Sequence, residues 1–356
     1  MTEKEKFLTF LAQFDLSVSK INQILNFMGD NLSIKAFCKA KFDEKVLTKL
    51  AFDKMCERAD ENRVENFLRN MENEGIILIN KLDKRYPSRL LGLDDAPFFL
   101  FCKGDISLLE KGGLAVVGSR KPSPYGRIVT ERFVRDVASA GVTIISGLAY
   151  GVDSIAHRKC LEVGGKTIAV LGGGLHEIYP PQHEDLAREI AEKGLLVSEY
   201  SPCHRATKFT FPQRNRIIAG LSDGVLITEA SYGSGTLHTR DFALEYGKNL
   251  YAVPGNIDSE LSALTNEIIK TGQGALVTEA KDILDDFHLA SEKPKQVLQL
   301  SLDEQKIISL LEDGMKEADF LAKNCDLSTN LLNSCLTTLE IRGLIRRMPG
   351  GFISLD

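Results

Sequence analysis

The sequence predicts a doubly wound, mainly parallel α/β sheet, preceded by a small helical domain and followed by a winged-helix-like domain. Short apolar runs alternate with amphipathic helical segments from about residue 112 to residue 288. Residues 1–75 show only helical periodicity, and residues 298–356 combine three helical segments with a hairpin. A length of 356 residues is too great for one ordinary core, which agrees with a division into several domains.

The first region, residues 1–75, is expected to be a compact set of short helices. Its apolar residues recur at helical spacing in two runs: Phe7, Leu8, Leu11 and Phe14, then Ile21, Ile24, Leu25 and Met28. No β-rich run interrupts them. Residues 76–111 form an extension that leads into the sheet, with expected strands at Ile76–Ile79 and Phe98–Phe101.

The α/β domain is expected to span residues 76–288. Its predicted strands are Leu114–Val117, Val142–Ser146, Thr167–Leu171, Leu195–Glu199, Gly224–Thr228, Leu250–Val253 and Ala275–Thr278. Helical patterns between them include Arg127–Ala140, Glu184–Lys193 and Thr236–Tyr246. Short apolar strands that alternate with helices indicate a parallel sheet covered on both faces.

The last region begins after a polar stretch. Residues 289–297 contain Pro294 and are interpreted as a linker. The final helix is expected at about 328–342, and it precedes two short apolar strands around Pro349-Gly350-Gly351, which indicate a hairpin. Three helices followed by a hairpin are typical of a winged helix, here over residues 298–356.

Composition excludes several classes of protein. No apolar run reaches the roughly 18 residues needed to span a bilayer, and the charged N-terminus does not resemble a signal peptide, so we expect a cytoplasmic protein with no membrane partner. The seven cysteines are scattered and never spaced as CxxC, which argues against a disulfide frame or a zinc ribbon. Cys203 and His204 are adjacent, but neighbouring side chains on a loop usually diverge, so no nucleophile–base pair is expected there.

Glycine-rich loops follow several predicted strands at one edge of the sheet. They lie at 118–126, 146–153, 172–175 and 229–236. Glycines let the backbone approach a ligand closely, and the N–H groups at the following helix starts favour anions. A tight turn would explain any one of these loops, but the set indicates a phosphate-bearing ligand at the carboxyl edge of the strands.

The segment 202–220, after the fourth of these strands, carries the strongest signal. It holds four lysine or arginine residues and no acidic residue, although the net charge of the chain is -5. Phe209 and Phe211 are interleaved with these cations. Basic groups neutralise phosphates and exposed aromatic rings stack on bases, so the segment favours a nucleic acid. One of the two phenylalanines is expected to belong to the core.

Nucleotide and catalytic motifs are absent from the sequence. The first loop reads GSRKPSPYG instead of GxGxxG, and Gly165-Lys166-Thr167 leads into a strand instead of out of one, which excludes a P-loop. No Ser/His/Asp order, HExxH run or metal-spaced carboxylate pair occurs. Asp153 follows Gly151 at a helix start, where we expect its carboxylate to cap free N–H groups. We therefore expect no enzyme activity, no cofactor and no metal.

Six motifs in order resemble the DNA-processing protein A (DprA/Smf) family. They are GSRxxSxYG at 118–126, SGLAYGVD at 146–153, AVLGGGL at 169–175, FPQRNRIIAGLS at 211–222, GSGT at 233–236 and AVPG at 252–255. The resemblance covers roughly residues 80–288 and implies a Rossmann-like fold that binds and protects single-stranded DNA. It further implies loading of the RecA recombinase during natural transformation, homodimerisation, and a SAM-like character for residues 1–75.

The resemblance also places a strand-binding pocket on this chain. The residues it implies are Gly118, Ser119, Arg120, Ser146, Gly147, Lys208, Phe211, Arg214, Asn215, Gly235 and Thr236. Lys208 would supply a cation and Phe211 a stacking face. His176 stands where an aspartate is usual, His183 replaces a frequent asparagine, and residues 237–241 depart from the usual LITAR, so the outer edge of the pocket differs from the family pattern.

Two other functions fit parts of the sequence. A Rossmann-like nucleotide-processing enzyme of the phosphoribohydrolase type would use a glutamate beside a Gly-Thr loop, as Glu229 and Gly235-Thr236 suggest. Its PGGxGTxxE-like run, with a second glutamate on the helix, is absent. A transcriptional regulator would read duplex DNA with its winged helix, yet the expected recognition helix around Thr329–Glu340 carries almost no cations. Binding of single-stranded DNA is favoured over both.

Overall fold

The computed structural model describes residues 2–287, 301–311, 314–325, 327–341, 344–348 and 351–355. The chain divides into two compact units, Met1–Ser291 and Glu292–Asp356, and each is considered by itself. The linker expected at 289–297 lies outside the described residues. Among the described residues, no helix combines the length and the apolar character that a membrane span requires.

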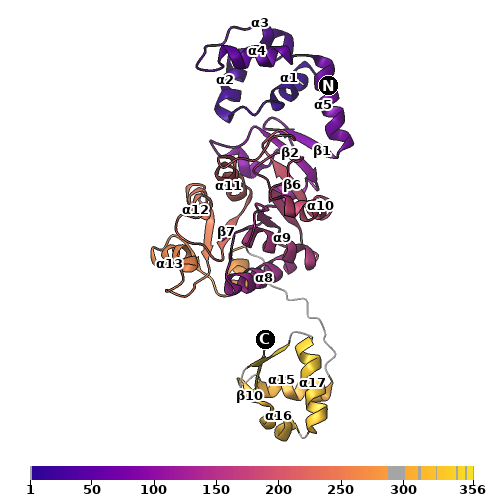
Figure 1. The fold of residues 1–356 in the computed structure, drawn as a ribbon, viewed down its shortest axis with the longest axis vertical. Coiled ribbons are helices and arrows are strands. Elements are labelled where there is room, and N and C mark those ends of the chain that lie inside the picture. The colour runs from indigo at the N-terminus through magenta and orange to yellow at the C-terminus, as the bar shows by residue number, and fades with distance from the viewer. Residues whose placement is uncertain are drawn as a thin grey trace. The chain divides into compact units, whose positions relative to one another are not determined.

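Five helices precede the sheet in the chain (Figure 1). They are α1 (Glu3–Ala12), α2 (Val18–Met28), α3 (Ile34–Lys39), α4 (Lys49–Glu57) and α5 (Glu61–Asn73). Each begins after a side chain that accepts a hydrogen bond from the backbone of the first turn: Thr2, Ser17, Ser33, Thr48 and Asp60. Their apolar faces meet around the buried rings of Phe7, Phe10 and Phe37. The same hydrophobic cluster continues into the sheet through Phe99 and Phe101.

Nine strands form one sheet in the order β1-β2-β6-β5-β4-β3-β7-β8-β9. They are β1 (Ile76–Asn80), β2 (Phe99–Gly104), β3 (Leu114–Val117), β4 (Ile144–Ser146), β5 (Thr167–Val170), β6 (Leu195–Ser198), β7 (Gly224–Ile227), β8 (Asn249–Ala252) and β9 (Ala275–Leu276). The pairs β1–β2 and β2–β6 are antiparallel, and all other neighbours are parallel. The predicted doubly wound, mainly parallel sheet is therefore confirmed.

Helices cover both faces of this sheet (Figure 1). Seven lie along its parallel part: α8 (Pro124–Ser139), α9 (Val152–Glu162), α10 (Glu184–Lys193), α11 (Thr210–Leu221), α12 (Thr236–Glu245), α13 (Ala263–Lys270) and α14 (Ala280–Asp286). In β3, Leu114 and Val116 pack in one core with α8, α9 and α14. Ala115 and Val117 pack in the other core with α11, α12 and α13. This alternation is the two-residue period of a strand buried on both faces.

The chain order of the strands reverses at β3. From β3 the chain moves outward through β4 and β5 to β6, and it then returns to place β7 on the other side of β3. In open α/β sheets, ligands bind outside the carboxyl ends of the strands at such a reversal. The loops after β3 and β7 therefore flank the place where a ligand is expected.

Strand ends differ from prediction at the sheet edge. The strand expected at Ala275–Thr278 ends at Leu276. The backbone N–H groups of Thr278 and Glu279 instead donate to the Asp282 carboxylate, 2.9 and 3.1 Å away. These two hydrogen bonds begin α14, and they compete with strand pairing for the same backbone N–H groups.

The second unit has the predicted winged-helix elements. Its helices are α15 (Leu302–Leu311), α16 (Ala318–Cys325) and α17 (Thr329–Ile341), and its strands are β10 (Lys316–Glu317), β11 (Ile345–Met348) and β12 (Phe352–Leu355). The strands form an antiparallel sheet in the order β10-β12-β11. A small apolar core, with Ile307, Leu321 and Leu339 fully buried, holds the helices to this sheet.

Candidate nucleic-acid interface

The candidate site lies where the loops after β3, β4 and β7 meet. The Ser119 N–H donates to the Glu229 carbonyl at 2.7 Å, and the Ser119 carbonyl accepts from the Val152 N–H at 3.1 Å. Glycine is required for this approach, because a Cβ at Gly118 would lie 2.7 Å from the Glu229 carbonyl oxygen. Gly151 has a φ of 75°, and a Cβ there would lie 2.2 Å from the Ser119 oxygen. The loop after β3 is therefore held between its neighbours by backbone contacts.

Arg214 lies beneath these loops and not on the surface. It is 3% exposed, and its Nη1 donates to the carbonyls of Gly147 and Val170. Burial lowers the pKa of Arg214 to about 10, and the nearby Asp153 carboxylate opposes that decrease. The guanidinium therefore remains charged at neutral pH. The sequence-based expectation gave Arg214 a direct contact with a ligand, whereas the structure gives it a role in positioning the loop after β4.

Asp153 shares this buried setting. Its Oδ2 accepts from the N–H groups of Gly147 and Ala149 at 3.2 and 3.4 Å. Burial raises the pKa of Asp153, and the charge of Arg214 opposes that rise. The expected helix cap is wrong, because Gly151 occupies the cap position and the carboxylate turns back to the preceding loop. Asp153 and Arg214 thus brace the loop after β4 from both sides.

Several predicted site residues form the floor of the site. Ser146 is fully buried, and its Oγ donates to the Val116 carbonyl at 2.7 Å, which ties β4 to β3. Gly147 is buried, and Ser119 and Thr236 are 9% and 6% exposed. Ser146 and Gly147 were expected to line the crevice, but their polar groups are already used within the protein.

The other predicted residues reach the surface. Arg120, Lys208 and Gly235 are exposed, and Gly118, Phe211 and Asn215 are half-buried. The Asn215 Nδ2 donates to the Gly235 carbonyl at 3.1 Å, which joins α11 to the loop before α12. The structure therefore brings residues from the loop after β3, the start of α11 and the start of α12 to one edge of the sheet.

Aromatic rings stand beside the cations at this edge. The Arg120 guanidinium lies 5.7 Å from the Phe211 ring centre, and the Lys208 Nζ lies 5.1 Å from that of Phe209. Phe209 is 69% exposed, and Phe211 is half-buried against Gly172, where a Cβ would lie 2.8 Å from the ring. The expectation that one of the two phenylalanines belongs to the core is wrong, because Phe209 is exposed, Phe211 is only half-buried, and neither joins a buried hydrophobic cluster of this unit.

Two tyrosines were missed in the sequence as stacking residues. Tyr179 is 52% exposed, and its ring centre lies 5.4 Å from that of Phe211. Tyr232, in the loop after β7, is 61% exposed. Both occur in glycine-rich loops at the carboxyl edge of the sheet. An aromatic residue in such a loop is the sequence feature that could have identified them.

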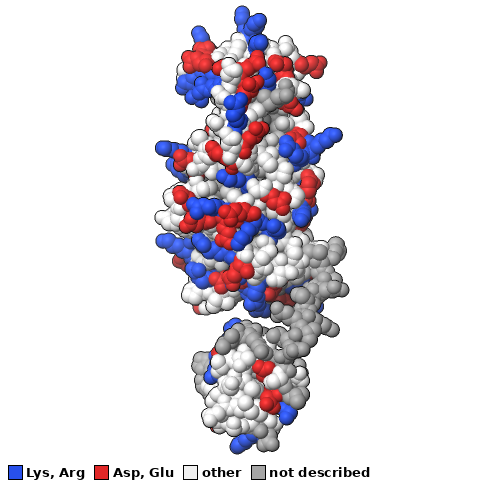
Figure 2. All heavy atoms as spheres, turned by 90° about the vertical axis from the view of Figure 1, so that its right-hand side faces the viewer, with Lys and Arg blue, Asp and Glu red and all other residues white. Residues whose placement is uncertain are grey.

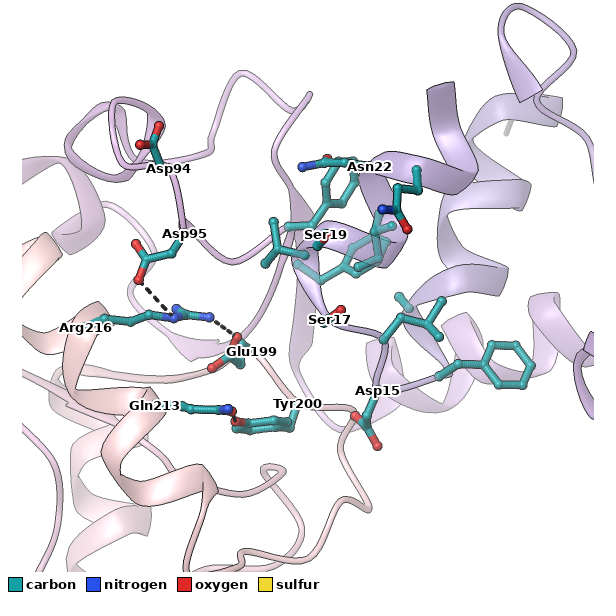
Figure 3. A pocket seen from close by; sticks show the side chains of 18 of the residues that line it. Asp15, Ser17, Ser19, Asn22, Asp94, Asp95, Glu199, Tyr200, Gln213 and Arg216 are labelled. Atoms are coloured by element: carbon teal, nitrogen blue, oxygen red, sulfur yellow. Dashed lines mark hydrogen bonds and ion pairs between the residues drawn. The ribbon is translucent and has the colours of Figure 1, made fainter. Parts of the chain in front are cut away.

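Not every cation of the segment 202–220 is free for a phosphate. Arg216 pairs with Glu199 at 2.5 Å and with Asp95 at 3.7 Å (Figure 3). Arg205 lies 3.8 Å from the Glu177 carboxylate. Within the described part of the chain, no carboxylate lies at ion-pair distance from Arg120 or Lys208. These two exposed cations are consequently the best placed to attract an anion.

A cavity of about 750 Å³ lies between the α1–α2 loop and the sheet domain (Figure 3). Arg216 enters it together with the carboxylates of Asp94, Asp95 and Glu199, and Asp15 lines its other side. The excess of acidic groups disfavours phosphate here. Figure 2 shows lysine, arginine and acidic side chains interspersed over the described residues of the face it presents. Neither sign of charge dominates this face.

Glu229 could have served as the acid or base of a nucleotide-processing enzyme. It is 2% exposed, and its two carboxylate oxygens accept from the Ser123 N–H and Oγ, both at 2.7 Å. A Cβ at Gly126 would lie 2.3 Å from one of these oxygens. The carboxylate thus holds the start of α8 and presents no free oxygen to a substrate, which disfavours the phosphoribohydrolase interpretation.

Known proteins share both units of the chain. A family model described as DNA recombination-mediator protein A matches residues 77–288, and one described as DprA winged helix domain matches residues 291–351. Protein Smf of Escherichia coli (strain K12) is 38% identical over 304 residues, which cover 82% of this chain and 81% of that protein.

Solved structures agree with this match. The X-ray structure of DNA processing protein A from Streptococcus pneumoniae is 33% identical with a TM-score of 0.68, and the similarity covers 80% of this chain and 98% of that chain. DNA processing protein A from Helicobacter pylori, whose structure is described as giving insights into a unique single-stranded DNA binding mode, is 32% identical. Its TM-score is 0.54, with 60% of this chain and 95% of that chain covered.

Proposed function

This chain belongs to the DNA recombination-mediator protein A family, and we propose that it binds single-stranded DNA at the carboxyl edge of its sheet. The observation that carries the proposal is the pairing of cations that have no carboxylate partner with aromatic rings: Arg120 with the half-buried Phe211, and Lys208 with the exposed Phe209. Cations attract the phosphates of a strand, and rings stack on its bases without reading their identity. The binding described for the H. pylori relative supports the same ligand class.

The proposed contacts divide by chemistry. Arg120 and Lys208 take phosphates, while Phe211 and Tyr179 offer adjoining faces to successive bases. Asn215 and the backbone of the half-buried Gly118 and the exposed Gly235 supply polar contacts beside them. The remaining predicted residues support the site from below: Ser119, Ser146, Gly147, Arg214 and Thr236. This division makes the proposed binding non-catalytic and independent of any cofactor or metal.

We further propose that the chain acts in the cytoplasm as a homodimer. In this role it would protect incoming single strands during natural transformation and load RecA recombinase onto them. Family membership is what supports these finer roles. RecA loading is tested by following RecA assembly on single strands that are already covered by a single-strand-binding protein. Faster assembly with the chain present supports the role, and an unchanged rate contradicts it.

The binding proposal is tested by a salt titration with an oligo-dT strand and a duplex of equal length. We expect tight, salt-sensitive binding to the single strand and much weaker binding to the duplex, because stacking on exposed rings requires unpaired bases. Equal affinity for both forms, or binding to neither, would overturn the proposal.

A further inference from the structure

Three side chains from separate segments meet at the loop between β6 and α11. The His176 Nδ1 lies 3.3 Å from the Cys203 Sγ, and the His176 Nε2 hydrogen-bonds the Glu74 carboxylate at the end of α5. Cys203 is exposed, whereas Cys102, Cys160 and Cys325 are buried. The adjacent His204 turns away to Asp15, 2.6 Å distant. The histidine beside the thiol is therefore one that is remote in sequence.

The hydrogen bonds define which ring nitrogen can act on the thiol. A carboxylate only accepts, so the His176 Nε2 carries the hydrogen that it donates to Glu74. In a neutral ring this leaves the lone pair on Nδ1, which faces the Cys203 Sγ–H. A thiol, an imidazole and an orienting carboxylate in this order are the arrangement that activates cysteine nucleophiles.

Backbone contacts hold this arrangement in register. The His176 N–H donates to the Pro202 carbonyl at 2.9 Å, and the Gly174 N–H donates to the His204 carbonyl at 2.8 Å. Gly174 has no room for a side chain, because a Cβ there would lie 2.2 Å from the Pro202 oxygen. The two loops thus run against each other at a fixed separation, which keeps the backbone of Cys203 beside that of His176.

We propose that Cys203 is an activated thiol that exchanges with low-molecular-weight disulfides, with His176 as the proton acceptor and Glu74 as its positioning residue. The Nδ1 takes the thiol proton, and the Cys203 sulfur attacks one sulfur of the disulfide. The S–S bond of the reagent breaks as the new S–S bond forms. The second sulfur leaves as a thiolate and recovers the proton from His176, so that one mixed disulfide and one free thiol result.

The adduct would change how the helical domain is held. A substituent on Cys203 occupies the space in front of His176, and His176 joins the sheet domain to Glu74 at the end of α5. Other charged groups around the thiol are Glu177, paired with Arg205, and Asp15, paired with His204. A modification of this thiol would therefore disturb the contact of the helical domain with His176 and the conformation of the loop that leads to α11.

The test uses the full reduced chain and oxidised glutathione, with the adducts located by peptide mass spectrometry. We expect Cys203 to be modified first, about tenfold faster than N-acetylcysteine at pH 7. A free thiol is only a few per cent ionised at that pH, and the lower nucleophilicity of a stabilised thiolate offsets part of the gain. Cys203→Ser should remove the fast phase.

Two variants and a matched control separate activation from simple exposure. His176→Gln keeps a polar side chain but cannot accept the proton, so its rate should fall about tenfold and decline steeply from pH 8 to pH 6, as for an ordinary thiol. The unmodified chain should react faster than His176→Gln throughout that range and lose rate less steeply, and Glu74→Gln should lie between the two. His204→Gln, next to the thiol in sequence, should react like the unmodified chain. A rate no faster than N-acetylcysteine, or an unchanged rate in folded His176→Gln, would overturn the proposal.

Discussion

Removal of one surface cation should change the salt dependence of strand binding by a fixed amount. Arg120 and Lys208 are exposed at the candidate site, and Lys121, next to Arg120 in the loop after β3, is exposed as a third cation; no ion pair involves any of them within the described ranges. Each phosphate contact to a single strand contributes a slope of about 0.7 in the logarithm of affinity against the logarithm of salt. Three contacts would give a slope of about −2, and Arg120→Ala or Lys208→Ala would each reduce it to about −1.4.

These slopes translate into measurable changes of affinity. Between about 50 and about 200 mM salt, the unmodified chain should lose about 20-fold in affinity, each single variant about 7-fold, and the double variant about 3-fold. Fluorescence anisotropy with a labelled oligo-dT strand gives these values directly. Lys193→Ala is the control for a cation away from the site, because Lys193 pairs with Glu189 and ends α10 at the opposite edge of the sheet, just before β6 begins. Slopes unchanged in folded Arg120→Ala and Lys208→Ala would refute the site assignment.

Three further predictions concern stacking, loop bracing and acid stability. Phe211→Ala should weaken binding of oligo-dT by about 1 to 3 kcal/mol, while Phe211→Tyr, which keeps the ring, should bind normally in the same anisotropy assay. Arg214→Met should lower the free energy of unfolding in urea by about 3 kcal/mol, because Asp153 and two carbonyls lose their buried cation; a loss below about 1 kcal/mol would contradict this. Burial lowers the pKa of His157 to about 3 from its ordinary 6.5, so the unfolded chain binds the proton first and stability is lost as pH falls from 6.5 toward 3. His157→Asn should flatten that decline in urea midpoints, and an identical pH dependence would count against it.

The strands could be predicted because the sheet is buried on both faces. Continuous apolar runs such as Leu114–Val117 and Gly224–Ile227 have no amphipathic alternative, and glycine-rich loops marked their carboxyl ends. The edge of the sheet that carries the candidate site followed from the same pattern, since all parallel strands end on one side.

The burial and the contact partners of individual polar side chains could not be predicted in the same way. Arg214 reaches carbonyls 67 and 44 residues away in sequence, and nothing in the segment 202–220 distinguishes it from the exposed Lys208. Cys203 contacts His176, 27 residues away in sequence, instead of the adjacent His204. Both outcomes depend on which loops the fold brings into contact, and a local pattern holds no information about those distances.

The position of β3 in the sheet also bears on how the chain is made. β3 pairs with β7, and Leu114 stands opposite Gly224, so its partner is synthesised 110 residues later. At about 5 to 20 residues per second, a ribosome needs about 5 to 20 s to cover that interval. During this time one edge of a wholly apolar strand has no neighbour. Synthesis through β7 is therefore the event that covers this edge of β3, and until then the edge is open to aggregation and to chaperones.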